Sequence, residues 1–414
     1  MKILFLSDDF PPKSFGGAGI ITYNLACGLA SAGHELHIIT TVQNKSDAGE
    51  KIVEGMKVYN LYIDYDGRLS GYFSLYNYRS VGKVKKLINQ IKPEVIHAHN
   101  VHHYLSYYTL ILARRFTNKL FLTTHDAMAF NYGKLINFYD KRNLEVQNKF
   151  SYKVGFIKNL MTAKKRYNPL RNLFIRYCLN KYPKKIFAIS NRLKDALNQN
   201  RIVNVETVYY GISTDSTIAN DDDNGEFSNK LNLNNSKVIL FGGRLSEAKG
   251  GKIAIDALSL LIKKDTSIAL LIAGTPNDYS KYLLKYAKDI GVINNIVFTG
   301  WLSREDMKKA YAVCDVCITP SVYFDAFNLF NIEAGAASKP VVGTCFGGTP
   351  EIILDKITGL IINPNNIEMF AEAIYSILSD NEYGNRLGKA GYERVKKVFN
   401  MDRYVKDTVY WYNK

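Results

Sequence analysis

The sequence predicts an α/β protein with two doubly wound domains, each a parallel β-sheet covered by helices on both faces. Short apolar runs rich in β-branched residues alternate with amphipathic stretches of helical periodicity, which is typical of such sheets. The alternation stops once, at the polar residues Ile212–Ser236, and then starts again. A chain of 414 residues, 47% of them hydrophobic, is long enough for two cores at about 200 residues per domain.

In the first half, strands and helices alternate from the first residues onward. The helical stretches include Ile20–Ala32, Val81–Ile91 and Leu105–Phe116. The apolar runs between them carry no polar interruption, so we expect parallel strands that are buried on both faces. These strands are Lys2–Leu6, His34–Thr40, Lys57–Ile63, Val95–Ala98, Leu120–Thr124 and Lys185–Ile189.

The pattern after the polar segment predicts a second sheet of the same kind. The expected helices are Lys252–Ile262, Tyr279–Ile290, Arg304–Ala312, Ile367–Leu378 and Tyr383–Phe399. The expected strands are Lys237–Phe241, Ile268–Ala273, Ile296–Phe298, Val316–Ile318, Val341–Thr344 and Leu360–Ile362.

We therefore divide the chain into a first domain over residues 1–210, a polar linker over 211–236 and a second domain over 237–395. Residues 396–414 are expected to form C-terminal helices that cross back to the first domain. Ligands of doubly wound sheets bind beyond the carboxyl ends of the strands. With two such domains facing each other, we expect the active site in the cleft between them.

Composition excludes several classes of protein. The apolar content excludes disorder, and 29 glycines with 10 prolines exclude a collagen-like chain. The longest apolar runs, such as Tyr104–Ala113, fall short of the roughly 18–20 residues that a membrane-spanning helix needs. Met1–Ser7 is too short for the apolar core of a signal peptide, because Asp8 and Asp9 follow it.

Cysteine content points to a reducing compartment. The chain has five cysteines, and an odd number in a long chain argues against a disulfide framework. Cys314 and Cys317 have CxxC spacing, but no second pair or histidine cluster accompanies them, so we interpret them as packing residues. We expect a cytoplasmic protein.

The net charge of +16 is unevenly distributed. Residues 1–210 contain 31 Lys and Arg against 14 Asp and Glu, whereas residues 211–414 contain 23 against 24. All of the excess positive charge therefore lies in the first half. Such a field favours anionic partners: phosphorylated substrates, nucleic acid or an acidic membrane surface.

A glycine-rich segment follows the first predicted strand. Gly16 and Gly17 precede the helix predicted from Ile20, and glycines there let the backbone approach a ligand at a helix N-terminus. The segment lacks the GxGxxG pattern and the acidic residue about 20 positions later, so a dinucleotide site is disfavoured. A tight connection without a ligand is the alternative interpretation.

The second domain opens with a sharper motif, Phe241–Gly251, between a strand and a helix. Arg244 and Lys249 lie there beside four glycines. Two cations at the carboxyl end of a strand suit a diphosphate, because Arg binds two oxygens as a fork and Lys acts as a point charge. A solvated surface loop is the alternative.

A third motif contains two carboxylates. Asp325 lies near the end of the loop after strand Val316–Ile318, and Glu333 lies on the following helix. The N-terminus of that helix, near Asn328–Phe330, offers N–H groups to an anion. Two carboxylates alone are a weak signal, since many surface helices have them.

Together these motifs resemble the retaining glycosyltransferases of family 4, which have the GT-B fold of two Rossmann-like domains facing across a cleft. The matching motifs are Gly16-Gly17, Gly243-Arg244-x4-Lys249-Gly250, Tyr323-x-Asp325-x7-Glu333-Ala334, Phe346-Gly-Gly-Thr-Pro-Glu351, Val95-Ile-His97-Ala-His99 and Thr124-His125-Asp126. The resemblance implies transfer of a sugar, with retention of configuration, from a nucleotide-diphosphate donor to a saccharide or lipid-linked acceptor. It suggests bacterial surface polysaccharide synthesis.

The resemblance also assigns catalytic roles by position. Arg244 and Lys249 would neutralise the donor diphosphate and the charge that grows on it as the glycosidic bond breaks. Asp325 occupies the place of the family's first glutamate, near the transferred sugar. His125 would hydrogen-bond that sugar or stabilise the developing charge.

The same resemblance predicts a donor-binding set. Glu333 would accept hydrogen bonds from both ribose hydroxyls, and backbone groups would surround the phosphates and the base. The remaining donor-binding residues are Gly16, Gly17, Gly300, Leu302, Asn328, Leu329 and Phe330.

The chain departs from the family pattern at three places. Asp325 is one methylene shorter than the family's glutamate and follows one extra residue, Phe324. Asn328 stands where glycine is common, and Tyr210-Gly211 replaces the usual Asn-Gly.

We expect neither a metal ion nor a cofactor besides the nucleotide-sugar co-substrate. Asp64 and Asp66 have DxD spacing but lie far in sequence from Arg244, so we interpret them as a solvated turn. The histidine cluster His97, His99, His102 and His103 has no carboxylate or thiolate placed to complete a zinc site, and we interpret it as structural.

One basic stretch suggests a membrane surface. Val146–Lys194 contains 13 Lys and Arg and no acidic residue, with aromatic and aliphatic residues between them. Such a composition suits the headgroup region of an anionic bilayer, so a peripheral location at the inner membrane face is expected. A solvated helical face packed on the domain is the alternative.

Two other functions stay open at this point. A non-enzymatic nucleic-acid-binding protein would explain the basic charge, although no binding module is present and we expect no nucleic-acid partner. A sugar-nucleotide epimerase of the same fold is the second, because a fold does not fix chemistry. A non-catalytic paralogue is also conceivable given Asp325.

Overall fold

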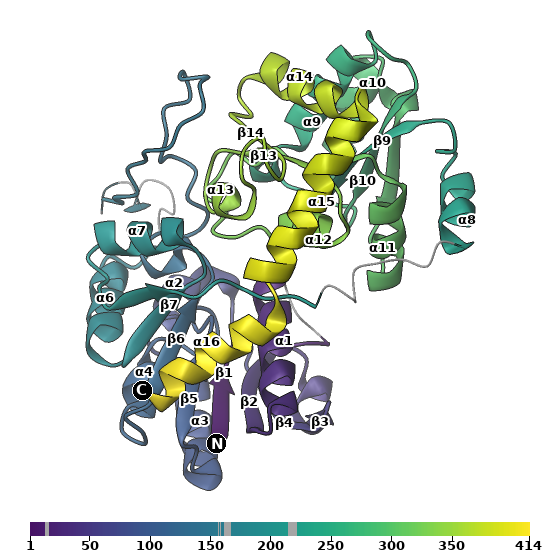
Figure 1. Cartoon of the computed structure of the whole chain (residues 1–414). Coiled ribbons are helices and arrows are strands. Elements are labelled where there is room, and N and C mark those ends of the chain that lie inside the picture. Colours follow the sequence, from purple (N-terminus) through teal and green to yellow (C-terminus); the bar gives the residue numbers. More distant parts are fainter. Residues whose placement is uncertain (13–15, 156, 158, 161–166, 214–221) are drawn as a thin grey trace. The chain divides into compact units, whose positions relative to one another are not determined.

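The computed structural model describes residues 1–12, 16–155, 157, 159–160, 167–213 and 222–414 (Figure 1). Within these residues the chain forms two compact units. Unit 1 comprises Met1–Leu135, Ser151–Gly211 and Met401–Lys414, and unit 2 comprises Ile136–Phe150 and Ile212–Asn400. The division differs from the predicted one in Ile136–Phe150, which the sequence placed with the first domain.

Unit 1 is built on one sheet, in the strand order β3-β4-β2-β1-β5-β6-β7-β8. Every strand predicted in this half is present, and β1, β5 and β6 have the predicted bounds. The strands of the sheet are β1 (Lys2–Leu6), β2 (Glu35–Val42), β3 (Gly49–Val53), β4 (Met56–Tyr62), β5 (Val95–Ala98), β6 (Leu120–Thr124), β7 (Lys185–Ala188) and β8 (Val205–Thr207).

The expectation of a purely parallel sheet is wrong at one edge. β3 pairs antiparallel with β4, through a two-residue turn at Glu54 and Gly55 whose φ angles are 47° and 74°. The residues of β3 are exposed or half-buried, so the strand carries no apolar run to reveal it. A turn with positive φ at both residues matches the right-handed twist of a β-hairpin. The turn therefore pairs β3 with β4 although β3 is polar and lies at the edge of the sheet.

Helices cover the sheet of unit 1, and the C-terminal helix belongs to it. α16 packs on α1 closely enough that a Cβ on Gly28 would lie 2.6 Å from Val405. This close approach explains why a glycine stands in the middle of α1. The helices of the unit are α1 (Gly17–Ser31), α2 (Ser70–Phe73), α3 (Tyr78–Ile91), α4 (Tyr108–Ala113), α6 (Arg171–Lys181), α7 (Asn191–Gln199) and α16 (Met401–Asn413).

Unit 2 has a parallel sheet in the order β11-β10-β9-β12-β13-β14. The order reverses beside β9, which is the arrangement of doubly wound nucleotide-binding sheets, and ligands bind such sheets where the order reverses. The predicted strands of this half are confirmed. They are β9 (Lys237–Gly242), β10 (Ile268–Ala273), β11 (Ile296–Gly300), β12 (Val316–Thr319), β13 (Val341–Thr344) and β14 (Leu360–Ile362).

The helices of unit 2 include one inside the predicted linker. Residues 214–221 of that linker lie outside the described residues, but Asp222–Lys230 forms α8. The other helices are α9 (Gly251–Leu261), α10 (Asp278–Asp289), α11 (Arg304–Val313), α12 (Leu329–Ala336), α13 (Thr349–Ile352), α14 (Ile367–Leu378) and α15 (Asn381–Val398).

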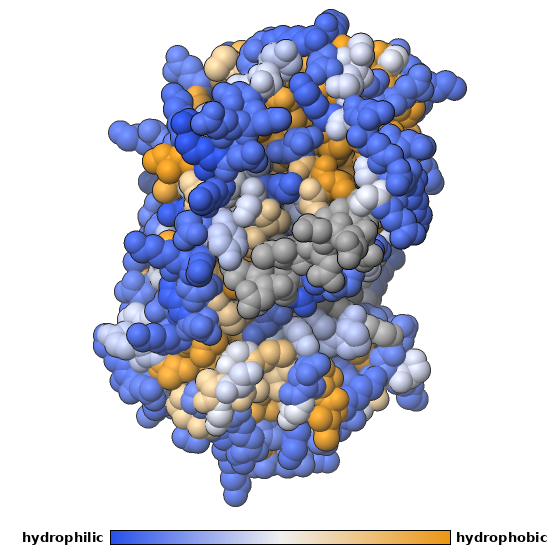
Figure 2. All heavy atoms as spheres, turned by 45° about the vertical axis from the view of Figure 1, so that its right-hand side comes forward, coloured by the Kyte–Doolittle hydropathy of each residue, from blue (hydrophilic) through white to orange (hydrophobic). Residues whose placement is uncertain are grey.

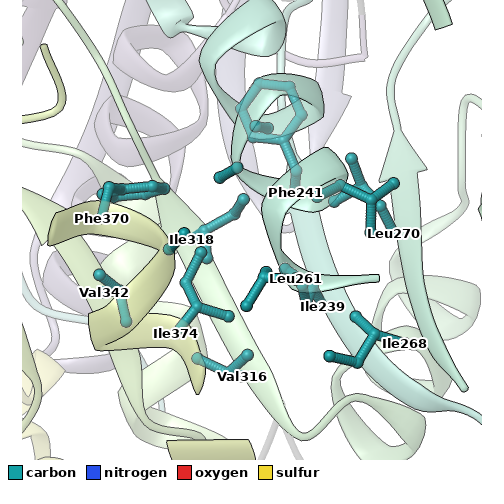
Figure 3. Packing of buried hydrophobic residues seen from close by; sticks show 14 of the residues in the cluster. Ile239, Phe241, Leu261, Ile268, Leu270, Val316, Ile318, Val342, Phe370 and Ile374 are labelled. Carbon is teal, nitrogen blue, oxygen red and sulfur yellow. The ribbon is translucent and has the colours of Figure 1, made fainter. Parts of the chain in front are cut away.

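The core of unit 2 lies between its sheet and the helices α9 and α14 (Figure 3). Ile239, Val316 and Ile318 from β9 and β12 pack with Leu261 of α9 and Ile374 of α14. All five side chains are at most 1% exposed. Burial of this kind is worth about 1.5–3 kcal/mol per side chain, and it fixes the strand ends from which the loops of the site emerge.

The visible surface is mostly hydrophilic, with small scattered hydrophobic patches (Figure 2). Among the described helices, none combines the length and the apolar content needed to cross a bilayer.

Candidate active site

The loop after β9 is held against the loop after β12. Gly250 has φ +80°, and a Cβ there would lie 2.0 Å from the carbonyl oxygen of Pro320. The N–H of Val322 donates to the carbonyl of Ala248 at 2.9 Å. Only glycine allows this approach, so the Gly250 of the sequence motif brings the two loops together.

This contact brings Lys249 and Asp325 together. The Nζ atom of Lys249 lies 2.7 Å from Oδ2 of Asp325, and it lies 5.5 Å from the centroid of the Tyr323 ring. The two charged side chains are 19% and 12% exposed. Burial lowers the pKa of Lys249, but Asp325 and Tyr323 outweigh burial, so this pKa lies above its ordinary value.

Arg244 lies on the exposed turn directly after β9, five residues before Lys249. Both cations therefore stand at the carboxyl end of the same strand, as predicted. The chain after β10 approaches the start of this turn closely, because a Cβ on Gly274 would lie 2.5 Å from the carbonyl oxygen of Gly243. The carboxyl ends of β9 and β10 thus meet at one edge of the sheet.

The N-terminus of α12 is capped by a side chain. Oδ1 of Asn328 accepts a hydrogen bond from the N–H of Phe330 at 3.2 Å. The Phe330 N–H, which was predicted to face the donor, is therefore already hydrogen-bonded within the protein. Its partner is Asn328, the residue that stands where the family commonly has glycine. The Phe330 ring lies against Gly242, where a Cβ would approach it to 2.5 Å.

Glu333 lies one turn further along α12 and is held by a tyrosine. The Tyr311 hydroxyl of α11 donates to Oε2 of Glu333 at 2.9 Å. Burial raises the pKa of Glu333, and the bond from Tyr311 and the charge of Arg304 oppose that rise. Among the described residues, the other carboxylate oxygen accepts no hydrogen bond, so it can accept further ones.

Gly300 and Leu302 lie at the end of β11. The carbonyl of Gly300 accepts a hydrogen bond from the N–H of Gly274 at 2.9 Å, which joins this end to β10. Trp301, between the two predicted residues, is 75% exposed. Unit 2 therefore gathers its predicted donor-binding residues on the carboxyl edge of one sheet.

Unit 1 holds the other predicted residues. Gly16 precedes α1 and Gly17 is its first residue, and no side chain in the described chain caps the helix there. Residues 13–15 of this segment lie outside the described residues. The first turn of α1 thus presents backbone N–H groups beyond the carboxyl end of β1.

His125 follows β6 and lies in a hydrogen-bonded row. Its Nε2 atom lies 3.1 Å from Nδ1 of His99, and its Nδ1 atom bonds the Tyr210 hydroxyl. Burial lowers the pKa of His125 to about 4. The charge of Asp126 opposes this shift, and that of His102 adds to it. Both imidazoles are neutral at pH 7, so one proton lies between the two facing nitrogens.

The row borders a small polar cavity. Nε2 of His99 is buried and has no partner within the described parts of the chain. The cavity is lined by His99, Asn100, Val101, His102, Tyr107, Leu122, Thr123, Thr124, His125, Asp126 and Ala129. An unpaired ring nitrogen beside a cavity suits a water or a hydroxyl group.

Some residues that hold these sites were missed in the sequence. Asp8 accepts backbone hydrogen bonds from His103, Tyr104 and Leu105 at 2.7–2.9 Å, which ties the end of β1 to the loop after β5. A carboxylate directly after a buried strand is the signal that reveals it. Tyr311 left no such signal, because its partner Glu333 is 22 residues away.

The features interpreted as structural have local partners. Asp66 pairs with Arg68 and caps the turn after it. Cys314 and Cys317 are buried thiols whose sulfurs lie 3.6 Å apart. Within the described residues, no group of three or more His, Cys, Asp or Glu side chains is arranged to hold a metal ion.

Comparison with known proteins identifies the family. Residues 15–216 match the model of Glycosyltransferase Family 4, and residues 223–394 match that of Glycosyl transferases group 1. The chain is a group 1 glycosyltransferase of family 4. The predicted family is thereby confirmed, and this glycosyltransferase is a transferase enzyme, which displaces the non-enzymatic alternative.

An uncharacterized glycosyltransferase of Methanocaldococcus jannaschii is 26% identical over 99% of this glycosyltransferase and 97% of its own length. Solved structures also resemble this glycosyltransferase along nearly its whole length. Sucrose-phosphate synthase of Thermosynechococcus elongatus matches with a TM-score of 0.79 at 19% identity, covering 100% of this chain and 98% of its own. Anabaena HepE, in complex with UDP-glucose, matches with 0.70 at 19%, covering 99% of each chain. These likenesses confirm the GT-B fold.

Proposed function

We propose that this glycosyltransferase moves a sugar, with retention of configuration, from a nucleotide-diphosphate donor to a saccharide or lipid-linked acceptor. The observation that carries the proposal is the pairing of Lys249 with Asp325 at 2.7 Å, with Arg244 in the same loop after β9. A cation and a carboxylate adjoin at the strand edge where doubly wound sheets bind ligands. The cation suits a diphosphate and the carboxylate suits a sugar hydroxyl.

The chemistry of the donor explains the need for two cations. When the bond between the anomeric carbon and the phosphate oxygen breaks, its electron pair stays on the diphosphate. Arg244 and Lys249 then stabilise a charge that is larger in the transition state than in the bound donor. Fixed cations of this kind accelerate a reaction because they bind the transition state more strongly than the substrate.

Glu333 would select the nucleoside part of the donor. Tyr311 holds one carboxylate oxygen, so the carboxylate is oriented before a ribose arrives. Two ribose hydroxyls can donate to such a carboxylate. We propose a uridine nucleotide as the first donor to test, because the similar HepE was solved with UDP-glucose.

In unit 1, His125 and the glycines Gly16 and Gly17 would act on the transferred sugar and the donor phosphates. Both ring nitrogens of His125 are already bonded, to His99 and to Tyr210, so a sugar hydroxyl would have to replace one of these partners. Because His125 is neutral near pH 7, the exchange would add no charge. No metal ion is part of this proposal, because Arg244 and Lys249 carry the phosphate charge. Turnover should therefore persist in EDTA, and its loss would contradict this part.

We further propose that the acceptor is linked to lipid or lies near an anionic bilayer, as in bacterial surface polysaccharide synthesis. Leu170, directly before α6, and Leu173 and Tyr177 within it follow one another at helical spacing. They are 65%, 54% and 49% exposed. Ile175 and Leu179 of the same helix are buried, so α6 packs on unit 1 with one side and exposes apolar residues on the other. This exposed side suits the headgroup region.

Part of the basic stretch is already used within the protein. Arg171 is fully buried, and Lys185 and Lys194 both pair with Glu206. Residues 156, 158 and 161–166 of the stretch lie outside the described residues. Co-sedimentation with anionic vesicles at low salt tests the membrane proposal. Replacement of Leu170 and Leu173 by Ser should abolish binding, and wild type that stays in the supernatant would contradict it.

A panel of UDP, GDP, ADP and TDP sugars, read by thermal shift, tests the donor proposal. A ligand at 100 times its Kd stabilises the folded protein by about 2.7 kcal/mol. Loss of the shift in Arg244→Gln is the expected signature of diphosphate binding. Consumption of donor only when an acceptor is present would support transfer, whereas an epimerised free nucleotide sugar would support the alternative.

A further inference from the structure

The segment Ile136–Phe150 leaves the first sheet unit and packs within unit 2. It follows β6 and contains neither helix nor strand, and the chain returns to unit 1 at Ser151 (Figure 1). We name residues 136–150 the aromatic strap. Its middle is fastened by the buried Asn363, whose side-chain amide donates to the carbonyls of Asn143 and Glu145 at 2.8 and 2.9 Å.

The rings of the strap form one cluster with two rings from other segments of unit 2, Phe324 and Phe346. Tyr139 stacks on Phe346 with centroids 4.0 Å apart, and Phe138 contacts Phe324 at 5.9 Å and Phe346 at 5.7 Å. Phe150 completes the cluster at 5.9 Å from Phe346. Phe138, Phe324 and Phe346 are at most 5% exposed. Aromatic pairs in such geometry add about 0.5–1.5 kcal/mol each beyond burial.

Both unit 2 rings adjoin the backbone of Asp325. Phe324 precedes Asp325 in the chain. Phe346 precedes Gly347 and Gly348, which contact the backbone of Asp325. The carbonyl of Asp325 accepts a hydrogen bond from the N–H of Gly348 at 2.8 Å. Gly347 has φ +62°, and a Cβ there would lie 2.0 Å from the same carbonyl. The strap therefore contacts the residues on both sides of the Asp325 backbone.

We propose that the aromatic strap positions Asp325 for transfer, with Phe138 acting through Phe324. This inference rests on the proposed role of Asp325 beside the transferred sugar. The strap accounts for two departures from the family pattern at once. The inserted Phe324 is the ring that Phe138 contacts, and the shorter aspartate needs a backbone held at a defined place. Displacement of a reacting group by about 1 Å can cost a hundredfold in rate.

The test compares matched substitutions in the full-length chain. Phe138→Leu and Phe370→Leu each remove one buried ring of unit 2, but Phe370 lies in the core cluster between sheet and helices. Asn363→Asp keeps the oxygen that accepts from Asn365 and removes the two amide bonds to the strap. Asn366→Asp, which preserves the cap of α14, is its control.

Phe138→Leu and Asn363→Asp should lower kcat about tenfold and leave the Kd for UDP within about twofold. Hydrogen exchange of peptides covering residues 321–328 should rise about tenfold in both variants and stay unchanged in Phe370→Leu and Asn366→Asp. Unchanged exchange over 321–328 in Phe138→Leu, or an equal fall of kcat in the controls, would overturn the inference.

Failure of the proposed function gives a different result. Wild type would then turn over no nucleotide sugar, while hydrogen exchange would still report whether the strap holds the Asp325 loop. Exchange that rises only in the strap variants supports the structural part of the inference in that case. Exchange over residues 321–328 that stays unchanged in the strap variants contradicts it.

Discussion

The Nζ atom of Lys249 lies 2.7 Å from Oδ2 of Asp325, so the cation proposed for the donor diphosphate already has a counter-ion. A mostly buried ammonium group without a partner is costly, and the carboxylate stabilises it while no donor is present. On the proposed function, an incoming diphosphate would compete with Asp325 for Lys249. We therefore expect the two residues to have opposite effects on donor affinity, although both would serve transfer.

Lys249→Met removes the charge and keeps most of the side-chain volume. Turnover should fall about 10²–10³-fold, because one fixed group that stabilises developing charge is lost. The measurement is kcat with a saturating donor. Lys263→Met, which removes an exposed lysine of the same unit, should keep wild-type turnover. Activity within a few-fold of wild type in Lys249→Met would refute the role of Lys249.

Asp325→Ala separates the two functions of the carboxylate. Turnover should fall at least about tenfold because a contact with the sugar is lost. The affinity for UDP should stay equal or rise, because Lys249 no longer has an internal competitor. Calorimetric titration with UDP and a rate assay give the two numbers. We would withdraw the sugar-side assignment if Asp325→Ala kept turnover within a few-fold.

Glu333→Gln tests recognition of the ribose. The amide cannot accept from two hydroxyls in the same way, so the affinity for UDP should fall about tenfold. Inorganic pyrophosphate, which has no ribose, should bind as in wild type. Glu351→Gln, a change of the same kind in the first turn of α13, is the control. Equal losses for both ligands would place Glu333 elsewhere in the mechanism.

The sequence predicted the helices and strands better than the contacts between residues far apart in the chain. Apolar strands such as Ile268–Ala273 were recognised because a strand buried on both faces has no polar residue. β3 was missed because an exposed edge strand has no such run. The strap was missed for a related reason, since its rings are spread over polar residues that carry no periodicity.

The site followed the same division. Arg244 and Lys249 were predicted because their motif is local, and the role of Asp325 was assigned by resemblance to the family. The bond between Lys249 and Asp325 joins residues 76 positions apart, and that of His125 with Tyr210 joins residues 85 apart. Partners at such separation depend on how two loops meet at a sheet edge. No single-sequence pattern contains this information.

The buried histidines predict the response of stability to acid. Burial lowers the pKa of His97 to about 3 and that of His125 to about 4, and His99 and His102 are also lowered. Unfolded histidines bind protons below about pH 6.5, so each group lowers the free energy of unfolding by about 1.4 kcal/mol per pH unit below that value. Three carboxyl groups whose pKa burial raises oppose them: Asp8, whose pKa rises to about 6, Asp126 and Glu333. Four histidines outweigh these three groups.

Urea unfolding at pH 7, 6 and 5 measures this response. The midpoint should fall between pH 6.5 and 5, and His97→Gln should fall less steeply because one titrating group is removed. His97 also bonds Tyr412 and Thr123, so the variant is compared by its slope with pH and not by its stability at pH 7. A midpoint that stays constant from pH 7 to 5 would contradict the prediction.

Gly250→Ala and Gly291→Ala separate backbone strain from close approach. The two glycines have φ +80° and +76°, so both alanines carry a left-handed penalty of about 1 kcal/mol. At Gly291 no atom lies within 4 Å of the added Cβ, whereas at Gly250 it would meet Pro320 O at 2.0 Å. The free energy of unfolding should therefore fall by about 1 kcal/mol in Gly291→Ala and by about 3 kcal/mol or more in Gly250→Ala.

Only Gly250→Ala should also lose turnover, because relief of the clash separates Lys249 from Asp325. Equal effects in the two variants would show that the loops are not in contact.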